Sequence, residues 1–113
     1  MNIVIYDAET PIMQISSDGI NAMSKWVGPK HIKIPKYLYP ESITPHGISK
    51  FCETRQPPRT RFDIEHVLKA YGLREYLPIQ MCKISYGITH EDDLWMLFEG
   101  QVKPRYVDIT IRP

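Results

Sequence analysis

Helix start and stop signals follow one another closely from Arg55 to Trp95, and they constrain the fold more than any other feature. Thr60 with Asp63 has the spacing of a capping pair, and Gly72 suits the left-handed residue that ends many helices. The apolar residues between them recur at the spacing of one helix face: Ile64, Val67, Leu68 and Tyr71. The sequence therefore predicts a helix between Thr60 and Tyr71.

A second helix is predicted from Pro78 to Tyr86. Proline is favoured in the first helical turn, where its missing N–H costs no hydrogen bond, and Gly87 follows as a stop. One side of the segment carries Ile79, Cys82 and Tyr86, so this helix has an apolar face to bury.

A third helix is predicted from His90 to Glu99, with Thr89 as its start. The acids at positions 91 to 93 lie in its first turn, where the helix dipole stabilises negative charge by about 0.3–1 kcal/mol. The same acids also suit general acid and base catalysis, but a helix start explains them sufficiently. In this interpretation Thr89, Asp92 and Trp95 have a structural role at the beginning of the helix.

An earlier helix is predicted to start at Thr44-Pro45 and to end before Pro57-Pro58. Ile48, Phe51 and Cys52 give it a core-facing stripe. Residues 44–100 are therefore predicted to form a cluster of about four short helices. Helices of this length are unstable alone, so they must pack on one another and on a sheet.

The N-terminal residues predict strands. Asn2 to Tyr6 and Ile12 to Ser16 favour β structure, and the residues between them favour a turn, so the two runs form a hairpin. Asp18-Gly19 then predicts a tight turn into a third strand from Ile20 to Val27. A short helix over Asn21 to Trp26 is the alternative.

Prolines dominate residues 28–45 and indicate a stiff, extended connection, with one short strand at His31 to Ile34. Tyr37 and Tyr39 lie in this segment. They form a protein-binding patch in one interpretation, because tyrosine is enriched in interface cores. In the other, their rings simply cover a small core.

The segment from Tyr106 to Arg112 alternates, with Val107, Ile109 and Ile111 on one face, and this pattern predicts a half-buried strand. The N-terminal hairpin is the sheet available to receive it. The prediction is thus a single α+β domain over residues 1–113. Residues 1–43 are mainly strands and the proline-rich connection, and residues 102–112 hold the C-terminal strand of a small antiparallel sheet packed on the helical cluster.

The charge balance excludes a global attraction to nucleic acid or to an anionic membrane, since the formal net charge is +1. No secretory signal or long apolar span is present, so the predicted location is the cytoplasm, with no membrane partner. Cys52 and Cys82 lie on apolar sides of predicted helices, which favours reduced, packed thiols over a disulfide.

No catalytic motif is recognisable, and the histidines and cysteines lack ligand spacing, so we expect neither an enzyme nor a bound metal or cofactor. DNA reading is disfavoured as well. The two helices at 60–71 and 78–86 invite a helix-turn-helix comparison, but their connection is long and only Gln80 and Lys83 would read bases.

Arg55, Arg59 and Arg61 form a cluster in a proline-stiffened loop just ahead of a helix start. Guanidinium groups and helix N–H groups together can hold a phosphate or carboxylate, so the cluster is a candidate site for a partner or an anion. The alternative is that these arginines pair inside the fold with the acids at positions 91 to 93.

Three groups of residues occur in a recognisable order: Arg55-x3-Arg59-x-Arg61 with Leu68-x3-Gly72-Leu73, then Gly87-Ile88-Thr89-x2-Asp92-x2-Trp95, and finally Tyr106-x-Asp108-Ile109-Thr110. Their order and spacing resemble the segment ahead of the kinase lobe in HipA-like proteins of Firmicutes. Tyr106 replaces the tryptophan of that family and Thr110 its asparagine, and no kinase lobe is present in these 113 residues.

The resemblance implies a free-standing relative of a regulatory module, without kinase activity. The leading expectation is a non-enzymatic protein-binding modulator, an accessory or antitoxin-like partner of a HipA-like kinase, which docks through the arginine loop and the nearby tyrosines. Its partner would then be a kinase-like toxin. The alternative is a phage or mobile-element inhibitor of a host defence nuclease, of the anti-CRISPR type, and a DNA-binding regulator ranks third.

Overall fold

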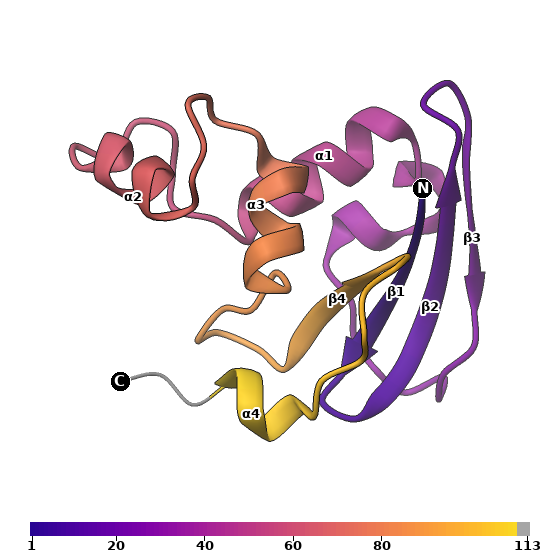
Figure 1. The fold of residues 1–113 in the computed structure, drawn as a ribbon. Helices are drawn as coiled ribbons and strands as arrows, with labels where there is room; N and C mark the ends of the chain where they lie inside the picture. The colour runs from indigo at the N-terminus through magenta and orange to yellow at the C-terminus, as the bar shows by residue number, and fades with distance from the viewer. Residues whose placement is uncertain (111–113) are drawn as a thin grey trace.

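The computed structural model describes residues 1–110, which form a four-stranded antiparallel sheet with helices on both faces (Figure 1). The strands run in the order β3-β2-β1-β4, so the N-terminal strand lies inside the sheet. Their bounds are β1 Asn2–Asp7, β2 Thr10–Ser17, β3 Ala22–Trp26 and β4 Leu94–Phe98. The predicted α+β class and antiparallel sheet are confirmed.

The N-terminal meander is confirmed, and one irregularity in it shapes the core. Ile5 faces Met13 across the hairpin, but Tyr6 faces Pro11, so Ile12 is an extra residue of a β-bulge. Ile12 and Met13 are consequently both buried although they are neighbours in the chain. The bulge is covered by Gly28, where a Cβ atom would lie only 2.8 Å from the Ile12 Cα atom.

The helices are short and follow the predicted start signals in most places. They are α1 Pro45–Thr54, α2 Ile64–Ala70, α3 Pro78–Ser85 and α4 Tyr106–Thr110, with 3-10 turns at η1 Lys36–Leu38 and η2 Pro40–Ser42. The Thr44 hydroxyl accepts a hydrogen bond from the Gly47 N–H, which confirms the predicted start of α1. Gly72 takes a left-handed φ of +73° after α2, as expected of a helix stop.

Two local predictions differ from the observed helices. The helix predicted from Thr60 begins only at Ile64, because the Asp63 carboxylate pairs with Arg61 and makes no capping hydrogen bond. The short strand predicted from His31 to Ile34 is absent, and those residues run without regular structure over the edge of the core.

The helix predicted from His90 to Glu99 is wrong, because Leu94–Phe98 is strand β4. This run is apolar on both faces. Met96 pairs with Ile5 in the core under α1 and α3, whereas Trp95 pairs with Tyr6 on the face that α4 covers. A strand between two packed layers buries all of these side chains, which a surface helix could not do. Thr89, Asp92 and Trp95 therefore do not start a helix; Thr89 and Asp92 lie in the turn that leads into β4.

The strand predicted from Tyr106 to Arg112 is also corrected, since Tyr106–Thr110 is helix α4, and Ile111 and Arg112 lie outside the described residues. The outer edge of β4, where such a strand would pair, explains the difference. There the Met96 N–H donates to the Tyr86 carbonyl, so the turn after α3 occupies part of the edge that a fifth strand would need.

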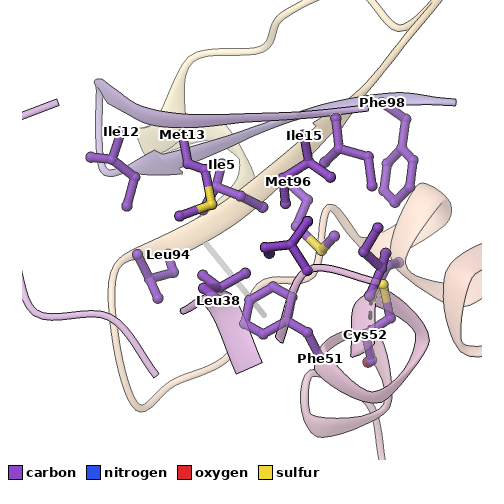
Figure 2. Packing of buried hydrophobic residues seen from close by; sticks show 14 residues of the cluster. Ile5, Ile12, Met13, Ile15, Leu38, Phe51, Cys52, Leu94, Met96 and Phe98 are labelled. Atoms are coloured by element: carbon purple, nitrogen blue, oxygen red, sulfur yellow. Dashed lines mark hydrogen bonds between the residues drawn. The ribbon is translucent and has the colours of Figure 1, made fainter. Parts of the chain in front are cut away.

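The main core lies between one face of the sheet and the helices α1 and α3 (Figure 2). Its side chains come from β1, β2 and β4, from α1 and α3, and from the 3-10 turn η1, among them Ile5, Met13, Phe51 and Met96. A second, smaller cluster lies on the opposite face, where Tyr6, Ile88 and Trp95 are covered by Tyr106 and Ile109 of α4. The smaller cluster thereby fixes α4 to the sheet.

None of the helices in residues 1–110 combines the length and the apolar character that crossing a bilayer requires.

Candidate functional site

Arg55 lies at the end of α1 and is an internal anchor of the fold. Its guanidinium donates to both Asp92 carboxylate oxygens at 2.7 Å, and its remaining hydrogen bonds go to the carbonyls of Gly87 and Leu94. Only 8% of the residue is exposed. The internal-pairing alternative thus holds for Arg55, and its assignment as a partner-binding residue is wrong because a partner cannot reach these donors.

The contact with Arg55 lowers the pKa of the Asp92 carboxylate. Burial acts to raise its pKa, but the hydrogen bonds and positive charge of Arg55 outweigh burial and hold the pKa below its ordinary value. The Leu94 N–H donates to the same carboxylate and adds to the effect. Asp92 therefore stays ionised and joins the end of α1 to the start of β4.

The next residues of the loop are fastened as well. The Gln56 side chain is buried, donates to the Ser85 hydroxyl and accepts from the Tyr71 hydroxyl. The Tyr76 hydroxyl donates to the Pro57 carbonyl at 2.7 Å. These contacts hold the loop against α3 and against the residues that follow α2, so its first half is rigid.

The loop reaches solvent at residues 59–62, which we call the loop tip. The Arg59 guanidinium lies 4.7 Å from the centre of the Tyr76 ring, a cation–π contact that leaves its outer edge free. Arg61 pairs with Asp63, yet about half of its side chain is exposed. Phe62 is 97% exposed, the most exposed large apolar residue in the part of the chain that the structure describes.

Sequence reasoning missed Phe62. The available signal was its position: it falls outside the apolar stripe of α2 and follows three polar residues, so no predicted core needed it. The arginines mark the loop that carries Phe62, and one of them, Arg55, is an internal anchor.

An open groove of about 540 Å³ adjoins the loop tip. Tyr37, Lys50 and Arg59 all line it, so the structure brings two of the predicted site residues, Tyr37 and Arg59, together. Lys50 pairs with Glu53 at 3.6 Å along α1. Tyr37 also packs against the main core, whereas Tyr39 is 43% exposed and does not line the groove.

The acids at positions 92 and 93 bind different partners and do not converge on one site. Asp92 is bound to Arg55, and the Asp93 carboxylate accepts a hydrogen bond from the Tyr106 hydroxyl at 2.8 Å. Burial and this hydrogen bond raise the pKa of Tyr106 to about 12. Within residues 1–110, no three His, Cys, Asp or Glu side chains gather as a metal site would require.

Most of the residues that carry the resemblance to HipA-like proteins contact one another. Arg55 bonds Asp92 and Gly87, and Trp95 lies between the rings of Tyr6 and Tyr106, at centroid distances of 4.4 and 6.4 Å. The Trp95 indole N–H also donates to the Ala8 carbonyl at 2.6 Å. These residues hold the scaffold together, and the loop tip projects from it.

Comparison of the chain with protein-family models, with curated proteins and with solved structures found no match.

Proposed function

We propose that this chain is a non-enzymatic protein-binding module, an accessory or antitoxin-like partner of a HipA-like kinase, and that the loop tip makes the central contact. The observation that carries the proposal is Phe62, a fully exposed aromatic residue between Arg61 and Asp63 on a loop with a rigid base. Exposed phenylalanine gains free energy only when a partner covers it.

The composition of the loop tip is that of an interface hot spot. Aromatic residues and arginine are the side chains whose truncation most often costs binding energy, and they act best at the centre of a desolvated patch. Arg59 and Arg61 precede Phe62 in the same loop and add donors for a partner's carboxylates or carbonyls. The adjacent groove with Tyr37 and Lys50 extends this surface.

The rigid base of the loop supports the proposal energetically. Binding loses affinity when a loop must be ordered, and this cost is small where the loop is already held in place. Here Arg55, Gln56 and Tyr76 fix the residues on which the tip stands. These contacts reduce the part of the loop that binding would have to order.

The kinase part of the proposal rests on the resemblance. The residues that carry the resemblance have scaffold roles here, as in the Arg55–Asp92 pair and the Trp95 stack. Scaffold residues are the ones that two chains built on a common module would share. The non-enzymatic part is supported by the acids, since Asp92 and Asp93 are each committed to a structural hydrogen bond.

The test is a binding measurement with matched variants. The tagged chain is used to capture proteins from the host, and the kinase encoded by that host is then purified and titrated by calorimetry. We expect Phe62→Ala to weaken binding by at least about 30-fold, the loss typical of a hot spot. Ile20→Ala is the control, because Ile20 is also an exposed apolar residue but lies at the opposite hairpin.

Equal weakening by both substitutions, or by neither, would reject the loop tip as the contact. Absence of any binding to the purified kinase would reject the kinase as the partner. Reproducible capture of a host defence nuclease, lost in Phe62→Ala, would support the inhibitor alternative in its place.

A further inference from the structure

Two thiols meet inside the core where α1 packs against α3. Cys52 is on α1 and Cys82 on α3, and neither side chain has any exposed surface (Figure 2 shows Cys52 at the edge of the core). The Cys82 thiol donates to the Cys52 carbonyl oxygen at 3.5 Å, so the two cysteines are in contact. Both are free, as the sequence indicated.

The two thiols have different neighbouring groups. The Gln56 amide donates to the Cys82 sulfur at 3.4 Å, and Arg55, the residue before it, brings a positive charge nearby. The hydrogen bond from Cys52, followed by these groups, lowers the pKa of Cys82. The same contact and burial raise the pKa of Cys52. The Gln56 donor thus distinguishes the Cys82 sulfur from that of Cys52.

We propose that Cys52 and Cys82 are an oxidation-sensitive dithiol, which hydrogen peroxide converts to an intramolecular disulfide between α1 and α3. The proposal is independent of the partner proposed above. Two thiols held in contact, one of them with a side-chain donor on its sulfur, can form an intramolecular disulfide once an oxidant reaches them. A packing role alone would be served by any pair of small apolar side chains.

The chemistry balances with peroxide as the oxidant. The Cys82 thiolate attacks one peroxide oxygen, the O–O bond breaks, and the departing hydroxide takes up a proton to form water, leaving a sulfenic acid. Cys52 then loses its proton and attacks the Cys82 sulfur, the S–O bond breaks, and the hydroxide leaves with that proton as a second water. Two thiols and one peroxide give one disulfide and two waters.

Access to the buried pair requires a local opening, and α3 is suited to it. Its N-terminus has no side-chain cap, and it ends at Tyr86, a non-glycine residue with a φ of +60°. Short helices with weak ends open at a lower free energy than the rest of a domain. A small neutral oxidant can therefore reach Cys82 without global unfolding.

The experiment treats the folded, reduced protein with excess hydrogen peroxide in native buffer, followed by alkylation and mass spectrometry. We expect a mass loss of two hydrogens, protection of both thiols from alkylation, and one cross-linked peptide pair that contains Cys52 and Cys82. Dithiothreitol should restore both thiols. The thermal unfolding midpoint of the oxidised protein should rise by several degrees, since the new bond closes a long loop.

Two variants separate the roles of the sulfurs. Cys52→Ser keeps a hydroxyl donor to Cys82, and we expect dimedone to trap a sulfenic acid at Cys82. Cys82→Ser leaves Cys52 alone, and we expect it to react with peroxide at least about tenfold more slowly, because burial still raises the pKa of the Cys52 thiol.

The wild-type measurement decides the matter even where a variant folds poorly. Thiols that remain unreacted until urea is added would overturn the proposal. So would oxidation that yields only sulfinic acids or disulfide-linked dimers.

Discussion

The guanidinium of Arg55 donates a hydrogen bond of 2.7 Å to each carboxylate oxygen of Asp92, although the two residues are 37 positions apart in the chain. This pair joins the end of α1 to the entrance of β4 and thereby links the helical layer to the sheet.

Replacement of Arg55 by alanine should destabilise the protein by about 3 kcal/mol, because Asp92 loses its partner and two buried carbonyls lose their donor. Lysine at this position should recover little, since it cannot form the bidentate contact. Urea unfolding followed by circular dichroism measures the free energy of unfolding. As a control, Arg74→Ala removes an exposed arginine and should change it by less than about 0.5 kcal/mol. A loss below about 1 kcal/mol for Arg55→Ala would contradict the anchor role.

The Asp92 pair should make stability depend on pH in acid. The pKa of Asp92 is lower in the folded protein than its ordinary value of 3.8, so its contribution is present above that value and is lost as the pH falls through the lowered pKa. Asp92→Asn removes the charge, and we expect the stability difference between wild type and this variant to shrink as the solution is acidified from neutral pH. Parallel unfolding curves at each pH provide the measurement, and a constant difference would argue against this linkage.

Tyr106 should show a late titration in alkali. Its pKa of about 12 lies above the ordinary value of 10.0, so folding protects its proton, and this contribution to stability is lost as the pH rises between those values. Absorbance titration of wild type minus Tyr106→Phe should isolate one tyrosine that ionises near pH 12. A difference spectrum that appears near pH 10 would mean that α4 does not hold Tyr106 against Trp95 and Asp93.

Gly47 gives an unusual prediction for a helix. Glycine to alanine inside a helix ordinarily stabilises it by about 0.5–1 kcal/mol. At position 47, however, the added Cβ would lie 1.9 Å from the Ser42 carbonyl oxygen, a backbone atom that cannot simply turn away. Gly47→Ala should therefore destabilise the protein by about 1–3 kcal/mol, whereas Ser49→Ala, in the same helix, should be close to neutral. Thermal unfolding of the two variants side by side tests the clash.

The parts of the fold that could be predicted are those set by local chemistry. The starts at Thr44-Pro45 and at Pro78, and the stop at Gly72, depend on backbone preferences and hydrogen bonds that lie within a few residues. The N-terminal meander is similar, because its turns and its β-favouring runs lie next to one another in the chain.

Where distant partners decide, sequence reasoning failed. The run Leu94–Phe98 is short and apolar, so helix and strand were both compatible with it, and only pairing with β1 selects the strand. The alternation after Tyr106 predicted a strand on the hairpin, but Tyr86 occupies part of the β4 edge beside it, and Tyr106–Thr110 is helical. The same limit applies to the candidate site. The arginine loop could be found from composition, but the burial of Arg55 and the exposure of Phe62 depend on distant contacts.

The position of β1 inside the sheet has a consequence for synthesis on the ribosome. Its pairing with β2 can form as soon as the first strands emerge, but its other edge waits for β4, in which Phe98 pairs with Ile3. Until then the nascent chain exposes an unpaired, apolar strand edge, the kind of template that recruits other chains. Translation of the helical segment in between sets how long that edge stays open, so slow codons between α1 and β4 should lower the yield of native protein.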